Sequence, residues 1–445
     1  MASNPMRSTT IGMWALMLAC LATTANAQSF SARRMAMGGV LLGGGPGGAA
    51  SNVAYRAVPE AKEGRTGIPL PIGLIPLLAD MPSFDPSDST FNAYELANLL
   101  YNPPWNITLG KTKTPSSDIT IEIAQNRLAV DLGDIADVFP KDHSKIGSSI
   151  NGPAVGFGVR QFFVALAPLV EYDNDLSLND ALRGALRDGE AFTPNTQYQV
   201  FDDGRAQAAA ALHLGAAIPL MQKGDPRAAG GAGVYAGARV KILRGVAYGQ
   251  AENVASFTTR DTLFGSDPVD IGYTGHYRDA GPSGGGWGRG LDLGVVWLMG
   301  NLELGLGAND VATRIDWKVR ESLAYTDSAS GNYVTNVIRT DAPFTSDVPT
   351  TVVANVAVRL GSVLLAGDVV RGINSTQGHA GAEIWLRNIA LRAGGSVDAN
   401  QKLQFGGGTG FRFGKLGLDV ALATNSRNLT RERTLELGAG LAFYH

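Results

Sequence analysis

The feature that most constrains the fold of this chain is an alternation with a period of two in its C-terminal half. In residues 416–424, Leu416, Leu418, Val420 and Leu422 alternate with Gly, Asp and Ala. The same alternation of large apolar residues with small or charged ones recurs at 291–297, 302–307, 389–394 and 435–443. Because successive side chains of a strand point to opposite faces, these segments predict β-strands with one apolar face and one small face.

Two architectures could hold such strands. In a soluble sandwich the apolar face forms the core and the other face carries polar residues. In a transmembrane barrel the apolar face meets lipid and the small or polar face lines the lumen. Here the second face is rich in glycine, which packs nothing on a solvated strand but suits a crowded, curved interior. The chain has 57 glycines in 445 residues and only 17% charged residues, so the pattern favours the barrel.

The spacing of the turns also favours a barrel. Tight connections at 299–301, 360–362, 386–388 and 413–415 alternate with longer polar ones at 310–349, 371–379, 397–402 and 424–433. Outer-membrane barrels alternate short periplasmic turns with longer external loops. The segments between these connections have about 9–12 residues, the length of a tilted membrane strand. Further strands are expected at 119–124, 128–132, 154–160, 162–172, 206–219, 231–252, 253–263 and 269–277. We therefore predict an all-β chain, a transmembrane antiparallel β-barrel of roughly 14–16 strands.

Segments 313–325 and 333–340 are expected to form a hairpin outside the membrane, or else an additional spanning pair. Two short helices are predicted from capping boxes, one at 92–101 starting with Asn92 and one at 177–187 starting with Ser177. Residues 28–115 contain much Gly and Pro and little alternation. We expect them to form a plug-like segment inside or under the barrel, with the barrel itself at 116–445.

The N-terminus has the pattern of an export signal. Arg7 is followed by the apolar run Ile11–Ala22 and the small-residue site Ala25-Asn26-Ala27, which predicts a signal peptide over residues 1–27 with cleavage after Ala27. Cys20 lies inside this signal and could instead be lipidated. Loss of Cys20 on cleavage would leave a chain without cysteine, and therefore without disulfides or thiolate metal sites. The predicted location is the bacterial outer membrane.

The last strand fits the pattern that barrel-insertion machinery is expected to read: a polar residue, a glycine, a hydrophobic residue and a terminal aromatic residue. Its candidate residues are Glu436, Gly438, Leu441 and Phe443.

Single charges interrupt the small face of the predicted strands. They are Asp292, Glu303, Arg359, Asp368, Glu383, Arg392, Asp419 and Glu436. A charge facing lipid costs about 2–4 kcal/mol for Arg at mid-depth, so we expect these side chains to face the lumen. They could form a salt-bridge network that packs a narrow interior, or line a polar path.

Nothing in the sequence indicates catalysis. No two of the five histidines stand at metal-ligand spacing, and no Ser, His and acid constellation is apparent. The formal net charge of -3 provides no attraction to nucleic acid. We therefore expect no catalytic residues, no cofactor, no metal and no nucleic-acid partner.

Two stretches resemble known proteins. Ser31-Ala32-Arg33-Arg34-Met35-Ala36-Met37-Gly38-Gly39 resembles the mature N-terminus of FadL/PorV-like outer-membrane proteins, and residues 379–445 resemble the C-terminal strands of that group. Asn52-Val53-Ala54-Tyr55 stands where that group commonly has an Asn-Pro-Ala-Gly-like turn.

The FadL-like side of the resemblance implies passive transport of small molecules, hydrophobic ones included. The PorV-like side implies an assembly or secretion-partner barrel without transport activity of its own. The implied partners are outer-membrane lipid, the insertion machinery, a small hydrophobic ligand and a protein partner.

Overall fold

The computed structural model describes residues 31–43, 46–59, 65–69, 107–108, 120–124, 127–131, 143–151, 155–159, 161–263, 269–327, 332–373, 376–397, 403–424 and 434–444. The expected signal peptide and the helix expected at 92–101 lie outside these ranges. None of the helices described is both long and apolar enough to cross a membrane.

The described N-terminal part contains α2 (Ala32–Ala36), α3 (Pro46–Ser51) and the 3-10 helix η1 (Val53–Arg56). Short strands β1 (Arg65–Pro69) and β2 (Ile107–Thr108) follow. The large antiparallel sheet is built mainly from β5 (His143–Asn151), β6 (Val155–Val159), β7 (Phe162–Leu178), β9 (Gln197–Lys223), β10 (Ala232–Thr259), β11 (Val269–Ala280), β12 (Gly285–Met299), β13 (Leu302–Thr326), β14 (Tyr333–Val348), β15 (Thr351–Leu360), β16 (Val363–Arg371), β17 (Thr376–Leu386), β18 (Ile389–Val397), β19 (Leu403–Phe413), β20 (Leu416–Thr424) and β21 (Thr434–Tyr444).

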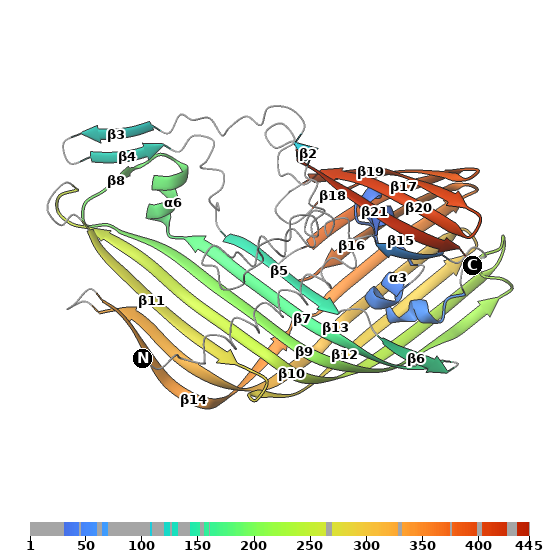
Figure 1. Cartoon of the computed structure of the whole chain (residues 1–445), viewed down its shortest axis with the longest axis horizontal. Coiled ribbons are helices and arrows are strands. Elements are labelled where there is room, and N and C mark those ends of the chain that lie inside the picture. Colours follow the sequence, from blue (N-terminus) through green and yellow to red (C-terminus); the bar gives the residue numbers. More distant parts are fainter. Residues whose placement is uncertain are drawn as a thin grey trace, which may run out of the picture.

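One continuous set of antiparallel pairings forms the wall of the molecule (Figure 1). It runs β6–β7–β9–β10–β12–β13–β15–β16–β17–β18–β19–β20–β21–β1. These are fourteen strands among the described residues, which agrees with the predicted antiparallel barrel.

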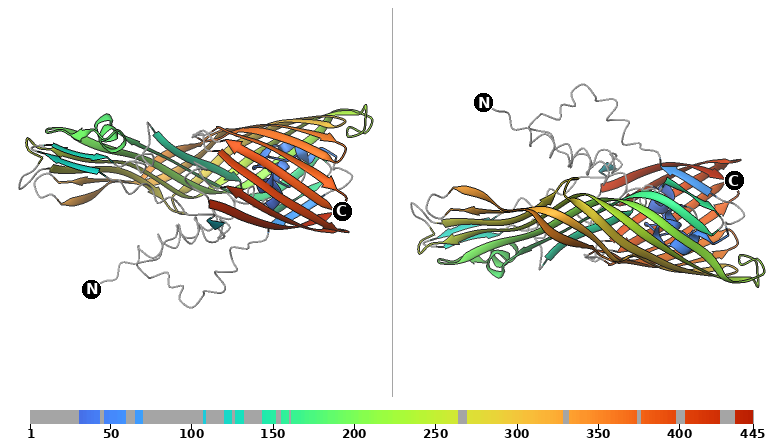
Figure 2. Two further views of the ribbon diagram at one scale, coloured as in Figure 1. Left: turned by 90° about the horizontal axis from the view of Figure 1, so that it is seen from above. Right: turned by 90° about the horizontal axis from the view of Figure 1, so that it is seen from below.

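The wall curves around the N-terminal helices, which lie inside it (Figure 2). α2 contacts β18, β19, β20 and β21, η1 contacts β9, β10 and β12, and α3 contacts β13. Neighbouring strands are about 4.8 Å apart, so a flat sheet of this many strands would be far too wide for one short segment to touch. The contacts therefore require a strongly curved wall, as in a barrel.

The two faces of the wall differ as the alternation predicts. On β20, Leu416 and Leu422 are exposed on the outside, whereas Gly417, Asp419 and Ala421 are buried on the inside. A soluble sandwich would bury the leucines, so the exposed apolar face argues against that alternative. On β12, exposed Trp287 and Trp297 bracket Leu291, Leu293 and Val295. Ten residues span about 33 Å along a strand, or about 23 Å in depth at a tilt of about 45°, close to the apolar band of a membrane barrel.

The four predicted tight connections are present, and all lie at the same end of the barrel. Each has its first turn residue in the left-handed region, with φ of 59° at Gly300, 60° at Gly361, 56° at Arg387 and 62° at Gly414. Because β21 runs towards this end, Tyr444 lies there too.

At the opposite end several strands run far beyond the barrel and form an extension (Figure 1). The segments expected as separate strands at 231–252 and 253–263 are one strand, β10, whose pairing with β9 continues without a break through Glu252 and Asn253. The hairpin expected at 313–325 and 333–340 is present, but its first arm continues β13 and its second is part of β14.

Three details of the expected layout are wrong. The predicted start of the barrel at residue 116 leaves β1 outside it, but β1 pairs with β21 in the wall. The hairpin of β3 (Thr120–Ala124) and β4 (Arg127–Asp131) joins β8 (Ala191–Phe192) in a separate small sheet, not the barrel. Helix α6 (Asp180–Arg187) starts at Asn179, whose side chain accepts a hydrogen bond from Leu182 N, because Ser177 still belongs to β7.

Candidate functional site: the filled lumen

Residues 31–43 and 46–59, which we call the lumen segment, lie against the small inner face of the wall. A Cβ atom on Gly394 or Gly406 would overlap the backbone of Met37 or Met35, respectively, and one on Gly307 would come within 2.6 Å of Ser51 O. The inner glycines therefore let the backbone of the segment approach the wall closely, which explains much of the glycine content of this face.

An ion-pair network ties the start of the lumen segment to three strands. Arg33 donates from Nε and Nη2 to the two carboxylate oxygens of Glu383 on β17, at 2.8 and 2.6 Å. Arg392 on β18 donates to Glu383 at 2.7 Å and to Asp419 on β20 at 2.8 Å. The two acids and Arg392 are buried. Each of the two acids is paired with at least one arginine, and a buried charge needs such a partner to offset its desolvation.

A second contact lies one strand further along. Asp368 on β16 accepts a hydrogen bond from Leu41 N at 2.5 Å and pairs with His379 Nδ1 at 2.6 Å. Within the segment, the Arg34 guanidinium donates to Gly39 O and Val40 O, which holds the turn after α2.

The end of the lumen segment is held by amide and phenol groups. Asn52 Nδ2 donates to Val295 O at 3.0 Å, and Asn309 Nδ2 donates to Ser51 O at 2.8 Å. Asn355 Nδ2 donates to Tyr55 OH at 2.6 Å. These polar contacts come from β12, β13 and β15.

The remaining predicted charges have varied surroundings. Asp292 is buried and paired with Arg239 and Lys241, and Lys241 also contacts Asp310 at 2.7 Å. Glu303 pairs with Arg227 at 3.4 Å.

Arg359 is exposed beside the tight turn, where its backbone N donates to Asn301 O. Glu436 lies in β21 opposite Ala423, and its side chain is outside the described parts. Of the expected insertion residues, Gly438 faces Ala32, while Leu441 and Phe443 are exposed.

Several partners were not singled out by sequence reasoning. Arg239 and Lys241 are two residues apart on β10 and share the inner face with Gly237, so the same alternation could have identified them. The pairing of Arg33 with Glu383 spans 350 positions in the sequence, and no local pattern predicts it.

Beyond the lumen segment, towards the extension, an apolar cluster packs between strands that are not neighbours in the wall. It joins β7, β9, β10 and β11 to β13 and β14 through Leu169, Ala209, Ala211, Leu243, Tyr248, Ala280, Ile315, Trp317, Val319, Ala342 and Val348. Phe344 packs against it, 5.2 Å from Tyr248 between ring centroids. We call this group the mouth cluster.

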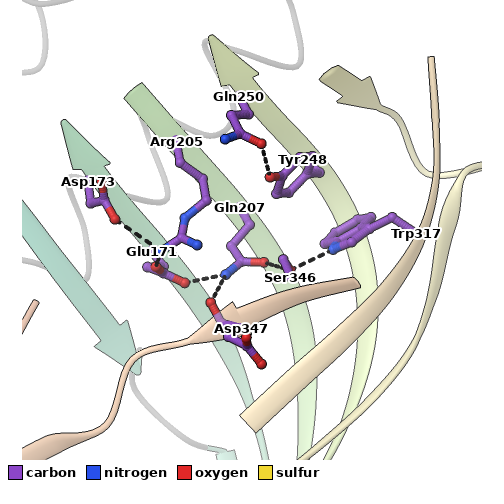
Figure 3. A network of polar contacts seen from close by, with 9 residues as sticks. All are labelled: Glu171, Asp173, Arg205, Gln207, Tyr248, Gln250, Trp317, Ser346 and Asp347. Carbon is purple, nitrogen blue, oxygen red and sulfur yellow. Dashed lines mark hydrogen bonds and ion pairs between the residues drawn. The ribbon is translucent and has the colours of Figure 1, made fainter. Parts of the chain in front are cut away.

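A polar network borders the mouth cluster (Figure 3). Trp317 Nε1 donates to Ser346 Oγ at 2.8 Å, and Ser346 donates to Gln207 Oε1 at 2.5 Å. Gln207 donates to Glu171, which also accepts from Arg205 at 2.7 Å. Burial raises the pKa of Glu171 to about 7, against the opposing effect of Arg205.

Further out, the extension has an open pocket of about 350 Å³. Asp175, Asp203 and Glu252 stand opposite one another on β7, β9 and β10, and His276 on β11 continues the row. Within the described parts of the chain, no group of three or more His, Cys, Asp or Glu residues is arranged to hold a metal ion.

Fold and site together define a β-barrel whose lumen is filled by its own N-terminal segment. The chain belongs to the family of unknown function DUF5723, whose model matches residues 124–431. No curated protein matches the sequence. The family match begins after the lumen segment, and so leaves the N-terminal motif untested.

Solved structures give distant matches. The toluene transporter TodX of Pseudomonas putida is 9% identical over 68% of this chain and 89% of its own, with a TM-score of 0.26. A porin from Rhodopseudomonas blastica is 10% identical over 63% of this chain and 100% of its own, with a TM-score of 0.22. The monoaromatic hydrocarbon channel CymD is 10% identical over 72% and 80%, with a TM-score of 0.18. Similarity at this level carries no argument about the solute of this chain.

Proposed function

We propose that this chain is a bacterial outer-membrane β-barrel through which small molecules pass passively when the lumen segment leaves its place. The membrane placement rests on the exposed apolar belt between Trp287 and Trp297 and on the small, charged inner face. The tight turns and Tyr444 would then face the periplasm, and the extension would face outward.

The observation that carries the proposal is the set of polar contacts between segment and wall, which accompany the apolar contacts of Met37, Val40 and Ala54. Arg33, Leu41, Asn52 and Tyr55 are each held by a polar group of a different strand. A permanently filled interior would gain as much or more stability from apolar packing, because buried ion pairs roughly offset their desolvation cost. Charged and glycine-rich walls remain compatible with water once the segment has left.

The solute class follows from the resemblance to FadL-like proteins, which implies small molecules, hydrophobic ones included. Passage also requires the mouth cluster to open, since Trp317 and Tyr248 are buried there.

An engineered disulfide tests this proposal. A Cβ on Gly438 would lie 3.8 Å from Ala32 Cβ, which is the usual Cβ separation in a disulfide. The nearby Met35 Sδ, at 2.6 Å from that position, is the end of a flexible side chain that can move. The double variant Ala32→Cys with Gly438→Cys would join α2 to β21, and cleavage of the signal would leave no competing cysteine.

In liposomes that contain this variant, we expect solute entry when the protein is reduced and at least a tenfold slower entry when it is oxidised. The single variant Gly438→Cys is the matched control and should not respond to the redox state. Equal entry in both states of the double variant, with the disulfide verified, would contradict gating by the lumen segment.

The second candidate is an assembly or secretion-partner barrel. It is favoured by the mouth cluster and by β14, whose only pairing partner among the described strands is β13 and whose Val337 and Ile338 are exposed. A defined partner that co-purifies in equal amount, and is lost in Val337→Lys, would favour this candidate. An unchanged yield of partner in Val337→Lys would argue against it.

A further inference from the structure

Arginines stand at nearly the same height on the outer face of three neighbouring strands, although Val246, which follows Arg244 outward on β10, is apolar again. On β12 the outward residues run Val295, Leu293 and Leu291 and then change to Arg289. Register places Ile242 of β10 and Arg314 of β13 opposite Arg289.

The next outward residue of β10 is Arg244, which lies opposite Trp287. Three arginines and one tryptophan therefore gather at the outer edge of the apolar belt, and we call them the rim patch.

The charges of the rim patch are only partly balanced by the protein. Arg289 and Arg314 are direct cross-strand neighbours, a position in which like charges destabilise a sheet. Arg314 Nε donates to Asp347 Oδ1 at 2.8 Å. Among the described residues, no carboxylate lies within ion-pair distance of Arg244 or Arg289. An external anion would remove this imbalance.

The geometry of the side chains suits a phosphate group. The guanidinium carbon of Arg244 lies 5.5 Å from the centre of the Trp287 ring, so a cation–π contact supports the arginine at the surface. Guanidinium groups bind phosphate oxygens through paired hydrogen bonds, and tryptophan favours the membrane–water boundary. Trp287 is 64% exposed and Arg314 65%, so both can be reached from outside the barrel.

We propose that the rim patch binds the phosphate groups of an outer-leaflet lipid headgroup. A lipid fits better than free phosphate because Ile242 and Leu291, directly beside the arginines, would contact its acyl chains. This assignment rests on the proposed membrane placement of the barrel and is independent of whether the lumen segment moves.

Binding to the purified full-length protein in detergent micelles tests the proposal. The probes are a phosphorylated lipid A-type glycolipid, the same glycolipid with its phosphates removed, and inorganic phosphate. For Arg289→Gln and for Arg314→Gln, we expect affinity for the phosphorylated glycolipid to fall about tenfold or more. The control is Arg260→Gln, an exposed arginine paired with Asp270 far out on the extension, which should change binding less than about twofold.

Equal binding of the two glycolipids by the parent protein would overturn the rim patch as a phosphate site. Inorganic phosphate that binds as tightly as the phosphorylated glycolipid would overturn its assignment to lipid. Recovery of the chain as a soluble protein without detergent would contradict the membrane placement itself, and this outcome is visible before any lipid is added.

Discussion

At the scale of single residues, the inner glycines of the wall are contact points for a second piece of chain. Gly406 and Gly407 are adjacent on β19 but differ in this respect: a Cβ on Gly406 would overlap Met35 O, whereas one on Gly407 would meet only Arg392 O, at 3.9 Å. Gly406→Val should loosen the lumen segment, since overpacking costs about 1–3 kcal/mol. Hydrogen exchange of residues 31–59 should then rise about tenfold or more, while Gly407→Val leaves it unchanged. Equal exchange in both variants would contradict this assignment.

A second prediction at this scale concerns Glu171 beside the mouth cluster. Its pKa is raised to about 7 by burial, whereas an unfolded chain ionises its Glu side chains near pH 4.3. Below about pH 4 the carboxyl is protonated in both states, so it does not destabilise the folded state. As the pH rises, the unfolded chain ionises first and the folded state loses stability, by up to about 4 kcal/mol above pH 7. Glu171→Gln should gain stability relative to the parent between pH 5 and pH 8. Urea unfolding of the purified protein measures this, and a pH-independent difference would contradict it.

At the scale of elements, the two faces of β20 provide a matched pair of substitutions. Leu418→Arg places a cation on the outer face and should cost about 2–4 kcal/mol of insertion free energy at mid-depth. Ala421→Arg points inward, where Ala421 packs against Ala32 and Ala36, so it should displace α2 and leave insertion intact. The measurements are heat-modifiable gel migration for insertion and hydrogen exchange for α2. Failure of both variants to insert would contradict the assignment of the two faces.

The elements also show what the sequence could and could not predict. The alternation of β20 and β21 and the tight turns could be predicted, because they depend on residues that are neighbours in the chain. Strand β1 has only five residues, too few for a period of two to stand out. The N-cap of α6 could not be predicted, because Ser177 and Asn179 are both good capping residues. Ser177 is excluded only because β7 extends to Leu178.

The candidate site, too, could be predicted only in part. The sequence indicated which charges belong to the small face, since strand parity fixes the face of each residue. Their partners depend on the lumen segment: Leu41 N reaches Asp368 across 327 positions. Such pairings form only when the wall curves around the segment. The residue pattern of a single strand therefore cannot predict them.

At the scale of the whole molecule, two layers occupy the interior: the lumen segment and, towards the extension, the mouth cluster. The first contacts the wall through ion pairs and hydrogen bonds as well as apolar side chains, whereas the second is apolar. A deletion that tests the first layer must spare β1, because residues 65–69 pair with β21 in the wall. Removing residues 32–59 meets this condition.

The most direct test of the central claim, that residues 31–59 close the lumen of a membrane barrel, is conductance in planar lipid bilayers. The intact protein should show little conductance, because the lumen is filled. The variant lacking residues 32–59, once shown by heat-modifiable migration to be folded and inserted, should open steady channels. Large, steady conductance from the intact protein, unchanged by the deletion, would contradict the claim and indicate a general diffusion pore.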